Sequence, residues 1–127
     1  MAARTRPLSP HLQVYRLPLV AVMSITHRIT GVGLAIGTIL LAAWLGAGAY
    51  SPDAYTGMSA FLGSWIGYVL LFLWSVALYY HLCNGIRHLF WDIGKGFVLA
   101  DAHRANAIVL AATVVLTVVT WVVALAR

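Results

Sequence analysis

Cysteine is nearly absent from this sequence, in which Cys83 is the single example. One thiol cannot form an internal disulfide, hold an iron-sulfur cluster, or provide the C-x-x-C-H attachment of a covalently bound haem. The glycine fingerprint of dinucleotide-binding folds is also missing. The chain alone therefore offers no means of binding a flavin or an iron-sulfur cluster.

Charged residues are scarce as well. They make up 9% of the 127 residues, against about 25% in ordinary soluble domains. Hydrophobic residues account for 62%, and the mean hydropathy is +0.90. A soluble domain of this size could not bury so much apolar surface, so the composition indicates a membrane protein. The net charge of +5 does not indicate nucleic-acid binding, because the basic residues lie at the edges of apolar runs.

Three long apolar runs predict an all-α membrane protein with three transmembrane helices in a bundle. We expect the spans at about 24–49, 61–93 and 105–126, within a single transmembrane domain over 1–127. A proline-rich, basic segment at about 1–23 is expected at the membrane surface, and residues 50–60 are expected to form a short loop. Gly33 and Gly37 form a G-x-x-x-G pair, with Gly31 and Ala35 beside them, which suggests a small-residue contact face on the first span. The third span is uninterruptedly apolar, which suggests a lipid-facing support helix without a site.

The distribution of Lys and Arg predicts the orientation, because cytoplasmic loops carry an excess of these residues. The N-terminal segment and the connection after the second span hold most of them, whereas the first connection has none and the C-terminus has Arg127. The N-terminus should therefore lie inside. This orientation places Ser24, Arg28 and His88 on the same side of the membrane.

The second span contains the most informative stretch. His81, Asn84, Gly85 and His88 are spaced to share one face of a helix, and the glycine opens that face to close approach. Counting back from Asp92 places His81 about 16 Å into the bilayer. A neutral imidazole at that depth suits an axial ligand of a b-type haem, although a hydrogen bond to a neighbouring helix would also explain it.

The edge of the membrane should carry cations for the haem propionates. Arg28, with His27, Arg87 and His88, would supply them on the predicted inner side. A haem with two histidine ligands needs a second imidazole, and this chain has one histidine at membrane depth. The other ligand should therefore come from a partner subunit.

Three motifs resemble the cytochrome b membrane-anchor subunit of succinate dehydrogenase, respiratory complex II. They are an N-terminal signature from Arg6 to Arg16, an S-x-x-H-R-x-[ST]-G motif from Ser24 to Gly31, and an H-x-x-x-G-[IL]-R-H-x-x-x-D motif from His81 to Asp92. The motifs occur in the family's order, and the likeness covers nearly the whole chain.

The resemblance implies roles for individual residues. His81 matches the axial ligand of haem b, and so the residue that binds the haem iron. Ser24 and Arg28 match residues that line the quinone site, while His27, Arg28 and His88 match positions near the haem propionates. The expected partners are a second small anchor subunit that shares the haem, an iron-sulfur subunit, a flavoprotein subunit and the lipid bilayer, and nucleic acid is not among them.

The implied function is electron transfer from succinate to quinone as one subunit of an assembly, with no catalytic residue on this chain alone. We expect a multi-pass protein of the bacterial inner membrane. The residues themselves do not distinguish this membrane from the mitochondrial one. Two alternatives remain at this point: a haem-free structural anchor, and a small transport or channel subunit. The latter should have polar residues along the full depth of a span.

Overall fold

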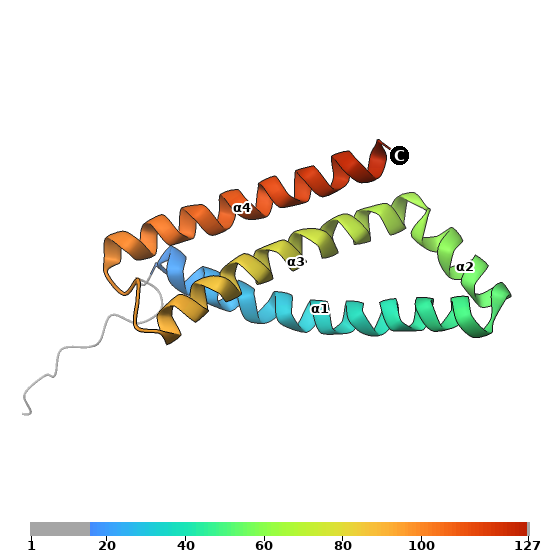
Figure 1. Ribbon diagram of the computed structural model, residues 1–127, viewed down its shortest axis with the longest axis horizontal. Helices are drawn as coiled ribbons and strands as arrows, with labels where there is room; N and C mark the ends of the chain where they lie inside the picture. The colour runs from blue at the N-terminus through green and yellow to red at the C-terminus, as the bar shows by residue number, and fades with distance from the viewer. Residues whose placement is uncertain (1–15, 127) are drawn as a thin grey trace, which may run out of the picture.

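The computed structural model describes residues 16–126, and every regular element in that part of the chain is helical. Four helices follow one another: α1 (Leu19–Tyr50), α2 (Pro52–Leu62), α3 (Trp65–Asp92) and α4 (Leu99–Leu125). Figure 1 shows α1, α3 and α4 running lengthwise, with α3 between the other two, while α2 joins α1 to α3 at one end. The end where α1 and α4 begin and α3 ends is called the basic end of the bundle below.

Three of the helices, α1, α3 and α4, are long and apolar enough to cross a membrane. The predicted class, an all-α membrane protein with three spans, is therefore confirmed. The helices do not share the predicted limits of the spans, because a helix can continue beyond the lipid. α1 begins at Leu19, directly after Pro18 in an extended conformation. Residues 19–23, expected in the surface segment, are thus helical, and residues 1–15 of that segment lie outside the described part.

The connection between the first two spans differs from the prediction. Residues 50–60 were expected to form a loop, but α2 occupies most of them and extends to Leu62. Pro52 stands at the start of α2, where its missing N–H costs nothing, and Asp53 lies in the first turn, where a negative charge is favourable. α3 begins at Trp65. Ser64 caps its N-terminus, because its side-chain oxygen accepts a hydrogen bond from the backbone N–H of Gly67 at 3.2 Å.

α4 also begins before its predicted span. The polar residues Asp101, His103 and Arg104 were placed in a connection, yet they lie in the first two turns of the helix. Their charge disfavours lipid but not helix formation, so hydropathy alone misplaces the start of the helix.

One face of α4 packs against α3, as expected of a support helix, while most of its other residues are exposed. The buried residues recur every three or four positions, and three of the five are polar: Ala102, Asn106, Val109, Thr113 and Thr117. The two threonine hydroxyls donate to carbonyl oxygens of their own helix. Further out, Trp121 donates to Ser75 at 2.9 Å, and Tyr79 shares a hydrogen bond with Thr120 at 2.6 Å. Polar contacts thus join α3 to α4 along much of their length.

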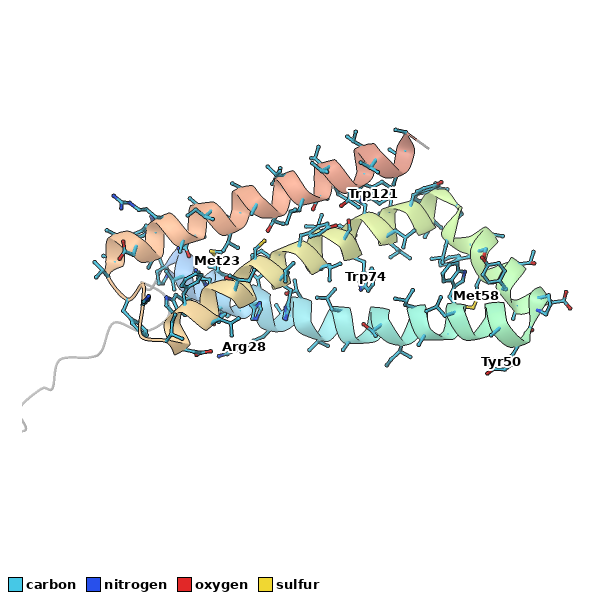
Figure 2. All side chains as sticks on the ribbon, in the orientation of Figure 1. Met23, Arg28, Tyr50, Met58, Trp74 and Trp121 are labelled. Carbon is cyan, nitrogen blue, oxygen red and sulfur yellow. The ribbon has the colours of Figure 1, made fainter. Side chains whose placement is uncertain are left out.

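Glycines in α1 allow close approach to α3, but only one member of the predicted pair is a contact position. Gly37 lies directly against the indole of Trp74, leaving no room for a Cβ, whereas a Cβ on Gly33 would meet nothing within 4 Å. Figure 2 shows Trp74 in the space between α3 and α1. The contact positions are therefore Gly31, discussed below, and Gly37.

Candidate functional site

His81 lies where α3 crosses α1 near the basic end. Its ring stacks on that of His27 from α1, with a centroid separation of 3.8 Å and an interplanar angle of 13°. Gly31 makes room for it, since a Cβ at that position would stand 3.0 Å from Cε1 of His81. The structure thus brings His81 and His27 together, and it does so through a glycine that the sequence analysis did not assign to the site.

The hydrogen bonds of His81 define its tautomer. Nδ1 lies 3.0 Å from the backbone carbonyl oxygen of His27 and 3.2 Å from Oγ1 of Thr30. A carbonyl oxygen can only accept, so Nδ1 carries the proton and the lone pair of the neutral ring resides on Nε2. The Thr30 hydroxyl donates its own proton to the backbone carbonyl oxygen of Thr26 or His27, each at 2.9 Å. Its oxygen is therefore free to accept a hydrogen bond from Nδ1 of His81.

A chain of aromatic contacts leads from this pair toward the end of α3. The rings of His27 and His88 are 5.1 Å apart, and His88 meets Trp91 edge-on at 5.0 Å. Gly85 lies against the ring of His27. A Cβ added to Gly85 would be 3.8 Å from Cε1 of His27. The predicted common face of His81, Gly85 and His88 is therefore present, and it is turned toward α1.

Asn84 completes the predicted face but behaves differently from the histidines. Its side chain is fully buried, and neither amide atom has a hydrogen-bond partner among the described residues. Nδ1 of His27 is likewise buried and without a partner there. Polar atoms without a partner are costly inside an apolar bundle, so Asn84 and His27 are unusual positions in this crossing.

Ser24 and Arg28 are one turn apart on α1, at the basic end. Ser24 is half-buried and Arg28 is exposed. Figure 2 shows Arg28 on the side of the bundle away from α4, whereas Met23, the residue before Ser24, lies between α1, α3 and α4. Arg28 therefore faces a different side from the α3–α4 contact.

Arg87 does not join the predicted cations of the histidine face. It is 4% exposed, and its Nη1 donates to Oδ1 of Asn106 on α4. Its guanidinium lies over the ring of Trp91, with 4.5 Å from Cζ to the ring centroid. One position before His88, Arg87 leaves the histidine face and lies between Asn106 of α4 and the sulfur of Met23 on α1, which is 3.9 Å from Nη1.

Two further contacts at this crossing were not predicted. Tyr80 donates its hydroxyl proton to the backbone carbonyl of Met23 at 2.7 Å, and Met23, Tyr80 and Val109 form the small buried core of the bundle. The signal for Thr30 and Gly31 was present in their motif, whereas nothing in the local sequence pairs Arg87 with Asn106.

Comparisons with known proteins bear on the whole chain. Residues 2–120 match the family model described as succinate dehydrogenase/fumarate reductase transmembrane subunit. The succinate dehydrogenase cytochrome b556 subunit of Paracoccus denitrificans is 48% identical over 93% of this chain and 91% of its own length. The subunit of the same name from Rickettsia felis is 41% identical over 92% and 91%.

A mitochondrial relative matches as well: the cytochrome b560 subunit of succinate dehydrogenase from Bos taurus is 40% identical over 89% of this chain and 68% of its own length. The resemblance inferred from the three motifs is confirmed by these matches. This integral membrane protein belongs to the succinate dehydrogenase/fumarate reductase transmembrane subunit family, among its cytochrome b membrane anchors.

Proposed function

We propose that this chain anchors a succinate:quinone oxidoreductase in the membrane, co-binds one haem b through His81, and forms part of the quinone-reduction site with Ser24 and Arg28. Electrons from succinate would reach the quinone at this anchor. The observation that carries the proposal is the geometry of His81, whose Nδ1 is bonded to the His27 carbonyl oxygen at 3.0 Å. Nε2 is therefore the nitrogen with a free lone pair.

The residues present fit a haem. Histidines that bind metals commonly donate their other ring N–H to a carbonyl or carboxylate, which fixes the ring and raises its basicity. Residues 16–126 contain no group of three or more His, Cys, Asp or Glu side chains able to hold a bare metal ion. A histidine whose ring is held by one nitrogen and whose other nitrogen has a free lone pair suits an iron that brings its other ligands with it, as in a porphyrin. When bound, the haem supplies a one-electron carrier between the partner's clusters and the quinone.

The haem would be shared with a second small anchor subunit that supplies the other axial ligand. His27, whose ring stacks on that of His81, is assigned to the propionates, so the second axial imidazole of a haem with two histidine ligands would come from the partner. His27, His88 and Arg28 would hold the propionates at the membrane edge. The remaining proposed partners are an iron-sulfur subunit and a flavoprotein subunit.

Ser24 and Arg28 would act on the quinone by hydrogen bonding. Both can donate to one carbonyl oxygen, because they are one turn apart on α1. The guanidinium also stabilises the negative charge that develops on that oxygen as the quinone is reduced. We place the chain in the inner membrane of a bacterium with its N-terminus inside, which puts this site on the side of the soluble subunits.

The haem assignment is tested by replacing His81 with Leu in the co-purified complex. We expect an altered reduced-minus-oxidised spectrum and an altered midpoint potential, because one axial ligand is lost. His103→Leu is the matched control, since His103 is exposed on α4 and should leave both properties unchanged. A spectrum and potential unaffected by His81→Leu would reject the assignment, and a complex without any b-type absorption would favour the haem-free anchor.

The quinone assignment is tested by Arg28→Leu, with Arg28→Lys for comparison. Removing a charged donor costs about 1.5–3 kcal/mol, so quinone-dependent turnover should fall roughly 10- to 150-fold. Turnover with an artificial acceptor that takes electrons from the soluble subunits should stay near the wild-type value. If Arg28→Leu lowers both rates equally or neither, or if Lys restores full quinone turnover, Arg28 is an interface or propionate cation instead.

A further inference from the structure

A groove of about 280 Å³ opens between α3 and α4 at the basic end of the bundle. One part of its lining is apolar and comes from the spans, including Ile86, Phe90 and Ile108. The other part is charged and comes from the end of α3, the connection and the start of α4, namely Arg87, Lys95, Asp101 and Arg104. No residue of α1 lines it, so it is distinct from the site of Ser24 and Arg28.

The charges of the groove favour an anion. Three cations stand against the single carboxylate of Asp101, which leaves a net charge of +2 (3 − 1). Lys95 and Arg104 are exposed, whereas Arg87 is 4% exposed. Nε and Nη2 of Arg87 have no hydrogen-bond partner among residues 16–126. A buried guanidinium with unused donors is stabilised by an acceptor oxygen, and an anionic oxygen is the strongest partner it can take.

We propose that this groove binds the phosphate of an anionic phospholipid. Lys95 and Arg104 contact the phosphate oxygens at the rim, and Arg87 attracts the same group from the wall of the groove. The volume suits a glycerophosphate head group, so the acyl chains leave the groove along the two helices. Ile86, Phe90 and Ile108, which are 47%, 54% and 67% exposed, provide the surface on which those chains lie.

The position of the groove favours a lipid over an acidic peptide. Its apolar wall belongs to two helices that can cross the membrane, and its charged wall lies where those helices end. Basic pockets between transmembrane helices at a membrane surface have the same combination of features and bind anionic head groups. An acidic peptide would leave the exposed apolar side chains without a partner.

The test uses the intact complex, delipidated and reconstituted in phosphatidylcholine nanodiscs with a small fraction of phosphatidylglycerol that carries a photoactivatable acyl chain. Cross-linked peptides are mapped by mass spectrometry. A cation near an anionic lipid contributes about fivefold in binding, so Lys95→Gln/Arg104→Gln should lower labelling of α3 and α4 around Ile86 and Ile108 by about 25-fold. Both side chains are exposed, so this variant should keep its fold and its haem spectrum.

Arg16→Gln is the matched control, because Arg16 is an exposed cation that does not line the groove. It should leave labelling unchanged, and a phosphatidylcholine probe should label the groove at least fivefold less. Equal labelling by the two lipids, or no effect of the double variant, would overturn the proposal. So would competition by soluble glycerol phosphate, which would mean a site for a free phosphate ester, or protection of the groove by a protein partner in the complex.

Discussion

Replacing Gly31 with Ala should disturb the site through a single methyl group. The added Cβ would stand 3.0 Å from Cε1 of His81, whereas carbon atoms pack best at about 3.5–4.0 Å. The ring must therefore move by about 0.5–1 Å, away from the His27 carbonyl that holds Nδ1. Overpacking of this kind costs about 1–3 kcal/mol, and the better helix propensity of Ala offsets about 1 kcal/mol of that cost.

The net cost in the pocket is thus up to about 2 kcal/mol. If it falls on the haem-bound state, haem affinity drops by up to about 30-fold. The spectrum and midpoint potential should shift as well, because the orientation of the ligand and its Nδ1 hydrogen bond change together. The assay is a redox titration of the purified complex, combined with the haem content per protein.

Gly46→Ala is the matched control, since it makes the same change in the same helix and its Cβ would meet nothing within 4 Å. It should give the full spectrum and haem content, with stability equal to or slightly above that of the wild type. The reasoning is refuted if Gly31→Ala and Gly46→Ala behave alike in potential, spectrum and haem content.

Three other predictions concern separate features. Thr30→Val should change the haem potential while Thr30→Ser preserves it, because the 3.2 Å contact with Nδ1 of His81 needs the hydroxyl. Equal potentials for the two variants would exclude a role of Thr30. Asn106→Leu should destabilise the complex by about 1.5–3 kcal/mol in thermal denaturation, since it leaves Nη1 of Arg87 without its acceptor. Thr113→Val should cost less, because the Thr113 hydroxyl bonds only within its own helix. The opposite order would contradict the argument. A cysteine introduced at position 54 should be labelled from the outside and one at position 95 from the inside; the reverse pattern would invert the proposed orientation.

The sequence predicted the three spans well because membrane hydropathy is a property of long runs, and no single residue decides it. It also predicted the face of His81, Gly85 and His88, since helical spacing alone determines that face. It missed α2, because a short helix with moderate hydropathy resembles a loop when only spans are sought, although Pro52 and Asp53 are good starting residues for a helix.

The contacts between helices were harder to predict. The single Asn106 hardly alters the hydropathy of α4, yet it is the acceptor of the hydrogen bond from Nη1 of Arg87. Gly33 and Gly37 have the spacing of a contact motif, but the rotation of α1 against α3 brings Gly31 and Gly37 against side chains of α3 and leaves Gly33 without a contact. Such rotations depend on the shapes of side chains on both helices, which spacing in one helix does not reveal.

The length of α1 has a consequence for Arg28. With 32 residues, the helix is about 48 Å long at 1.5 Å per residue, against a hydrocarbon thickness of about 30 Å. Even at a tilt of 40°, the upper end of the observed range, it would cover about 37 Å of depth, so several residues must stand in the head-group layer. If part of that surplus lies at the basic end, Arg28, nine residues after Leu19, sits at the boundary of the hydrocarbon. It can then keep its charge beside an apolar quinone without bearing the insertion penalty of about 2.5–3.5 kcal/mol for an arginine at the bilayer centre.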